Sequence, residues 1–212
     1  MSPRRRLPSA TDLSVALGCA VVTIGAFVAA PVLLAPEHDV VVDAVAHWAT
    51  IAALAAQAVL LAAARVAPRT AVLGIAGIAM LLGILVPSGL TNLAHAAVIV
   101  AVLRTTSLLS TRSARVALPL AALAVAIGQA SDVARADGVA LGAAVAAGAL
   151  QAVVVVALPA VAVLAVTARQ DARRARSGES AAIEREHDAR VEAAVARERT
   201  GMARELHDIA AH

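Results

Sequence analysis

The sequence predicts an all-α protein: a six-helix transmembrane bundle followed by a cytoplasmic coiled-coil-like helix. Of the 212 residues, 60% are hydrophobic, and the mean hydropathy of +0.82 is far above that of soluble domains. The apolar residues form six runs of about the length that a helix needs to cross a bilayer, roughly 20 residues. After Thr167 the composition changes abruptly to Ala, Arg and Glu. We therefore expect a six-span membrane region at 1–167 and a cytoplasmic segment at 168–212.

The six spans are predicted near 13–35, 44–64, 70–87, 89–109, 115–131 and 139–167. The first run is too long and too poorly terminated for a cleaved signal peptide, and five more runs follow it. The turn Pro87-Ser88-Gly89 separates the third run from the fourth, as expected for a helical hairpin. Pro159, within the last run, is a candidate kink. Gly138 and Gly142 form a weak GxxxG signal for a close helix contact.

The charges in the connecting segments alternate along the chain. Arginines, the only basic residues apart from histidine, gather before the first run and after the second, fourth and sixth: Arg4 to Arg6, Arg65 and Arg69, Arg104, Arg112 and Arg115, and Arg169, Arg173, Arg174 and Arg176. With six spans, all these segments fall on one side, which the positive-inside rule assigns to the cytoplasm. The sequence thus predicts a multi-pass protein of the plasma membrane with both termini cytoplasmic. Because the arginines lie between apolar runs, the pI of 10.8 does not indicate direct nucleic-acid binding.

Six polar side chains fall at membrane depth in this prediction: His47, Gln57, Asn92, His95, Gln129 and Gln151. Polar groups in hydrocarbon are costly and often functional, but bonding between helices or a place near the interface is the more frequent explanation. The predicted outer loops are about ten residues or shorter, so we expect any stimulus to be detected in or at the bilayer.

The tail from Ser180 onward consists of strong helix formers, and Ser180 itself is a candidate N-cap. Val195, Met202 and Ile209 recur every seven residues, and Val191 and Leu206 flank this stripe. Such spacing predicts a two-stranded coiled coil or the first helix of a bundle, and therefore a homodimer. The alternative is a single solvated charged helix.

The last fifteen residues, Glu198 to His212, read ERTGMARELHDIAAH. This stretch resembles the phosphoacceptor segment of sensor histidine kinases. It looks most like the subgroup that includes nitrate-sensing and membrane-fluidity-sensing kinases, whose dimerisation helix carries E-R-x-x-[IM]-A-R-E-L-H-D-x-x-x-[QH]. A multi-span membrane region followed by a helical stalk also matches the architecture of that subgroup.

The resemblance implies a role for three residues. His207 would accept the phosphoryl group of ATP, Asp208 would act as the base, and His212 would assist removal of phosphate from a partner response regulator. An imidazole nitrogen is a suitable phosphoryl acceptor when its proton is removed. His187-Asp188 is a second His-Asp pair on the tail, but it lacks the preceding R-E-L and is interpreted as a surface pair.

The sequence also departs from the family pattern. Gly201 stands where the family tends to have a polar helix former, and Ala211 where it often has Gly. The family implies ATP and Mg²⁺, but the Asn-containing and Gly-rich motifs of its ATP-binding domain appear nowhere in these residues. We therefore expect the chain to be inactive as a kinase by itself. The alternatives are a small six-span transporter-like protein and a non-catalytic membrane signalling remnant.

Overall fold

The computed structural model describes residues 8–34, 44–86, 91–135 and 139–211. These residues are helical apart from short turns, with no strand among them, which confirms the all-α fold class. In chain order the elements are α1 (Ala10–Leu34), α2 (Ala44–Ala62), α3 (Pro68–Leu85), α4 (Thr91–Thr105), α5 (Thr111–Ala134), α6 (Leu141–Ala152), η1 (Val153–Ala157) and α7 (Leu158–Ala211). The chain divides into two compact units, Met1–Leu164 and Ala165–His212, which we call the membrane unit and the tail unit.

Five helical segments among the described residues are long and apolar enough to cross a membrane: Ala10–Ala29, Ala44–Ala62, Pro68–Leu85, Thr111–Ala134 and Leu141–Ser177. The protein is thus a multi-helix membrane protein in character. The fourth predicted span is shorter than expected, because α4 has only 15 residues. At 1.5 Å per residue it is about 22 Å long, against a hydrocarbon core of about 30 Å.

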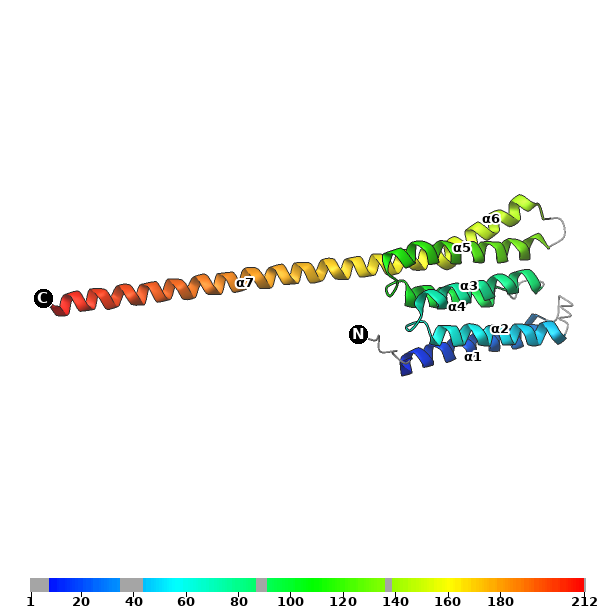
Figure 1. Ribbon diagram of the computed structural model, residues 1–212, viewed down its shortest axis with the longest axis horizontal. Coiled ribbons are helices and arrows are strands. Elements are labelled where there is room, and N and C mark those ends of the chain that lie inside the picture. The colour runs from blue at the N-terminus through cyan, green and yellow to red at the C-terminus, as the bar shows by residue number, and fades with distance from the viewer. Residues whose placement is uncertain (1–7, 35–43, 87–90, 136–138, 212) are drawn as a thin grey trace. The chain divides into compact units, whose positions relative to one another are not determined.

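Polar contacts at the two ends of the bundle define how the helices alternate. At one end, Asp12 in the first turn of α1 contacts Arg65, just after α2, and Arg104 in the last turn of α4. At the other end, Arg135, which follows α5, donates to the carbonyl oxygen of Gly83 near the end of α3. Neighbouring helices therefore run in opposite directions (Figure 1), and α4 crosses the same bundle as its longer neighbours.

Local sequence explains several helix ends. Pro68 occupies the first turn of α3, where its missing N–H costs no hydrogen bond. Ser110 caps α5: its hydroxyl oxygen accepts a hydrogen bond from the backbone N–H of Ser113 at 3.3 Å. Pro119 lies inside α5, which nevertheless continues to Ala134.

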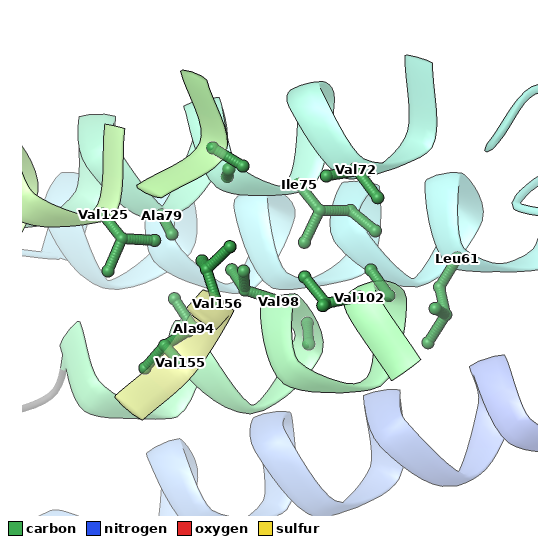
Figure 2. Close-up of a cluster of buried hydrophobic side chains, with 14 of the residues drawn as sticks. Leu61, Val72, Ile75, Ala79, Ala94, Val98, Val102, Val125, Val155 and Val156 are labelled. Carbon is green, nitrogen blue, oxygen red and sulfur yellow. The ribbon is translucent and has the colours of Figure 1, made fainter. Parts of the chain in front are cut away.

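The core of the membrane unit lies where α3, α4 and α5 meet η1. Val98 and Val102 of α4 pack with Val72 and Ile75 of α3, and all four side chains are fully buried. Figure 2 shows Val155 and Val156 of η1 beside this cluster. Outward-facing leucines and valines remain exposed on every helix of the unit, as expected for a surface that contacts lipid.

Three glycines, none of them in the predicted GxxxG pair, allow close approach of the helices. A Cβ atom on Gly83 would lie 2.5 Å from the carbonyl oxygen of Gly128, so the backbones of α3 and α5 touch at this point. Gly148 of α6 meets α5 in the same way, at the carbonyl oxygen of Ala126. Gly142 has no neighbour within 4 Å of its Cβ position among the described residues, and Gly138 lies outside them. Small residues at helix contacts are a general feature of membrane bundles.

The helix α7 differs from the sequence-based expectation at its middle. The sequence predicted a new helix capped by Ser180, but α7 is continuous from Leu158 to Ala211. The Ser177 hydroxyl donates to the carbonyl oxygen of Arg174, three residues earlier, at 2.9 Å, a bond that serines inside helices can form. Ion pairs three and four residues apart, Asp171–Arg174 and Glu186–Arg190, lie along its exposed surface.

Candidate functional site

The histidine kinase-like motif lies on α7, within the tail unit. His207 and Asp208 both fall inside the helix, where consecutive residues point about 100° apart around the axis. Gly201, which stands where the resembled family tends to have a polar helix former, does not interrupt the helix. His212 lies outside the described residues. The motif from Glu198 to Ala211 is thus presented on a single helical segment.

A second candidate site is the layer of buried polar side chains in the membrane unit. Gln57 of α2 is 1% exposed. Its Nε2 donates to the carbonyl oxygen of Ile75 at 3.1 Å and, more weakly, to that of Ala94 at 3.5 Å. Its Oε1 has no hydrogen-bond partner among the described residues. Gln57 therefore ties α2 to both α3 and α4 in the interior of the bundle.

His95 forms the other half of this layer. It is 3% exposed, and its Nδ1 lies 3.0 Å from Nε2 of Gln151 in α6. This contact pairs the Gln151 amide with the imidazole ring. Together, Gln57 and Gln151 hold α4 from two sides. The expectation that polar groups at membrane depth bond between helices is confirmed for Gln57, His95 and Gln151.

The remaining predicted polar groups are not part of this layer. The His47 ring is partly buried, with its centroid 5.0 Å from that of Phe27 and 5.9 Å from that of Trp48. Asn92 is exposed. Gln129 has a buried Oε1 without a hydrogen-bond partner among the described residues. We assign no function to these three side chains.

A buried ion cluster, which the sequence did not predict, lies at the end of the bundle where α1 begins. Asp12 is 2% exposed, and its Oδ1 lies 3.0 Å from Nε of Arg65 and 2.8 Å from Nη2 of Arg104. Its Oδ2 accepts from the backbone N–H of Ser9 at 3.0 Å and from the Ser9 hydroxyl at 2.6 Å. Ser9 Oγ in turn accepts from the N–H of Asp12, which completes a capping box. The pattern S-x-x-D before an apolar run could have revealed this capping box, but not the two arginines that contact Asp12.

Arg135 binds the end of α3 at the opposite end of the bundle. Its guanidinium donates to the carbonyl oxygens of Gly83, at 2.6 Å, of Val86, at 2.9 Å, and of Ile84, and it pairs with Asp132 at 3.2 Å. The last carbonyls of a helix lack partners within it, so Arg135 caps α3. This explains why an arginine is present on the side of the bundle that the sequence predicts to be poor in positive charge.

The ion cluster predicts an unequal coupling between Asp12 and its two arginines. Arg104 is 19% exposed and Arg65 is 54% exposed, so water screens the second pair more strongly. In double-mutant cycles of thermal stability in detergent, Asp12→Asn should couple more strongly to Arg104→Gln than to Arg65→Gln. Equal coupling energies would contradict this assignment of the buried partner.

The arrangement as a whole defines a class of protein, a helical membrane protein with a long charged helix after its last span. Its buried polar groups connect helices, and the described residues contain no cluster of three or more His, Cys, Asp or Glu side chains suited to a metal ion. Comparison of the chain with models of protein families, with curated proteins and with solved structures finds no match. Functional assignment therefore depends on the motif of α7 and on the construction of the bundle.

Proposed function

We propose that this chain is the sensing and phosphoacceptor part of a membrane sensor histidine kinase in a two-component system. The observation that carries the proposal is the motif E-R-T-G-M-A-R-E-L-H-D on α7, the helix that also forms the end of the last apolar segment. A continuous helix between a membrane bundle and an acceptor histidine is a direct physical route from stimulus to chemistry. Polar contacts within the bundle hold α2, α3, α4 and α6 together as its sensing part.

The proposed reaction needs only a few groups. A ring nitrogen of His207 attacks the γ-phosphorus of ATP, the bond between that phosphorus and the bridging oxygen breaks, and ADP leaves. The carboxylate of Asp208 takes the imidazole proton. The phosphoryl group then passes from His207 to an aspartate of a response regulator, and His212 assists its later hydrolysis. Mg²⁺ would offset the phosphate charge, and the proposal places ATP and Mg²⁺ on a nucleotide-binding domain that is not among these 212 residues.

Charge placement supports a plasma-membrane location with both termini in the cytoplasm, where ATP is present. The end of the bundle marked by Asp12 also carries Arg69, Arg112 and Arg115, which lie at or beside the adjoining helix starts and are exposed or nearly so. At the opposite end, Arg135 is engaged with α3. The positive-inside rule therefore favours a cytoplasmic location for the Asp12 end. The seven-residue spacing in the tail supports a homodimer.

A transporter-like function is the main alternative. A transporter requires polar groups that can bind and release a solute or coupling ion at membrane depth. The Asp12 carboxylate is instead occupied by two arginines and Ser9. The glutamines of the polar layer likewise bond to neighbouring helices. No observation on the described residues favours transport.

The test is direct detection of phosphohistidine. Native membranes that contain the protein are incubated with ATP, and the tail peptides are analysed by mass spectrometry under alkaline conditions that preserve the N–P bond. We expect an acid-labile phosphoryl group on the peptide that contains His207. A phosphoryl group on another residue of the tail, or none while a control kinase in the same membranes is labelled, would contradict the proposal.

A further inference from the structure

The last helix of the membrane unit contains one turn of π-helix. Between α6 and α7, the five residues of η1, Val153–Ala157, widen the helix, and the N–H of Leu158 donates to the carbonyl oxygen of Val153, five residues back. Such a turn accommodates one residue more than an α-helix of the same length. π-Turns inside α-helices are rare and occur frequently at functional sites.

The burial pattern shows why the packing needs this extra residue. Along α6, η1 and the start of α7, a buried position recurs every four residues: Ala144, Gly148, Ala152, Val156 and Ala160. In an undistorted α-helix, sixteen residues at 100° each would leave the last position about 160° away from the first. One residue taken up by the π-turn reduces this drift to about 60°. The π-turn therefore keeps Val156 and Ala160 on the face that packs against the bundle.

The sequence around η1 permits a second register. Without the extra residue, each downstream position moves back by one, so that Val155 takes the place of Val156. Residues 153–156 are four consecutive valines, and Val155 and Val156 are both buried against the core cluster that Figure 2 shows. The exchange of one valine for the next leaves the shape and polarity of that contact unchanged.

Two features determine which register is occupied. Upstream, Gln151 is bonded to His95 of α4, which fixes the end of α6 against the bundle. Downstream, Pro159 lacks an N–H, and in a regular α-helix its ring would clash with the carbonyl of Val155. In the second register Pro159 would also take the place of the smaller Ala160. Both effects of Pro159 favour the π-turn, and the hydrogen bond of Gln151 directs any change into the helix that follows.

We propose that η1 is a register switch. Conversion of its π-turn into regular α-helix would turn the first turns of α7 by about 100° and shift them by about 1.5 Å along their axis, relative to the bundle. The role of this motion in signalling rests on the proposed function, because α7 continues to the motif that contains His207. A rotation of this size would change which face of the first turns of α7 packs against the bundle.

The switch can be tested in the full chain in lipid nanodiscs without any phosphorylation assay. A trifluoromethyl group is attached to cysteine in an Ala160→Cys, Cys19→Ser background and observed by ¹⁹F NMR. Dissolved oxygen, which concentrates in the hydrocarbon, broadens the resonance of a lipid-exposed label. Ala160 is 6% exposed, whereas Val161, whose place it would take after the switch, is 61% exposed. We expect a main resonance protected from oxygen, and an exposed minor state of less than about 10%.

Pro159→Ala should bring the two states to comparable populations, because it removes the clash with the carbonyl of Val155 and places a small alanine, not proline, at the buried site that residue 160 leaves. Deletion of Val154 removes the extra residue, so it should leave only the protected resonance, even when combined with Pro159→Ala. Deletion of Ala146, an exposed residue in regular α6, is the matched control and should disturb the packed signal. A single resonance in Pro159→Ala, or a second one that survives deletion of Val154, would overturn the switch. Since no step involves phosphate, failure of the kinase proposal would leave this result intact.

Discussion

Replacement of His207 by glutamine is expected to abolish phosphorylation of the tail. Glutamine keeps the helix propensity and a polar side chain of similar size, but an amide has no nucleophilic ring nitrogen. Phosphorylation should therefore fall to background, not by a modest factor. Asp208→Asn removes the proposed base and retains the acceptor, so it should slow phosphorylation by about 10²-fold or more. Both effects are measured in native membranes by alkaline-stable, acid-labile incorporation of phosphate from ATP.

The chain provides a matched control for this experiment. His187-Asp188 is another His-Asp pair on α7, twenty positions earlier. His187→Gln makes the same chemical change on the same helix, and the level of phosphate incorporation should stay unchanged. If His187→Gln and His207→Gln reduced labelling equally, the R-E-L context of His207 would have no special role.

Substitution of Gly83 by alanine should destabilise the membrane unit, although alanine is the better helix former. The new Cβ atom would lie 2.5 Å from the backbone of Gly128, and neither side of this contact has a side chain that can move away. The helices α3 and α5 would have to separate, at a cost of about 2 kcal/mol. The same substitution at Gly77, also on α3, meets nothing within 4 Å among the described residues. It should stabilise the protein by up to about 1 kcal/mol.

Thermal unfolding of the two variants in the same detergent measures this difference. The opposite signs expected for Gly83→Ala and Gly77→Ala make the comparison independent of the absolute scale. A higher melting temperature for Gly83→Ala would contradict the close contact of α3 and α5.

The composition and the apolar runs of about 20 residues were sufficient to predict an all-helical membrane fold. The bilayer imposes length and hydrophobicity on every segment that crosses it. The ends of the helices were less predictable. The segment predicted at 89–109 is the 15-residue α4. The charge pattern counted Arg104 among the connecting segments, but it lies in the last turn of α4 and pairs with Asp12. Short-range sequence signals do not reveal a partner 92 positions away.

Two further features depend on packing and not on local sequence. The glycines that matter are those at which two backbones meet, Gly83 with Gly128 and Gly148 with Ala126, and a GxxxG search selects glycines by spacing alone. The sequence indicated a kink at Pro159, and the structure has a π-turn directly before it. Whether a proline is accompanied by a kink or by a π-turn depends on which face of the helix has to pack against the bundle. For the motif the situation is reversed: its residue types are evident in the sequence, and the fold adds their place on one helix.

We propose that six crossings leave the motif-bearing tail on the cytoplasmic side, where ATP is found. Side-specific cysteine labelling in intact cells, in a Cys19→Ser background, tests this topology. Single cysteines are placed at Ser110 between α4 and α5, at Ala140 before α6, and at Ser177 in the tail, all of them exposed positions. We expect a membrane-impermeant maleimide to label only position 140, and positions 110 and 177 to react only after the cells are opened. Labelling of position 177 from outside would place His207 away from ATP and contradict the proposed function.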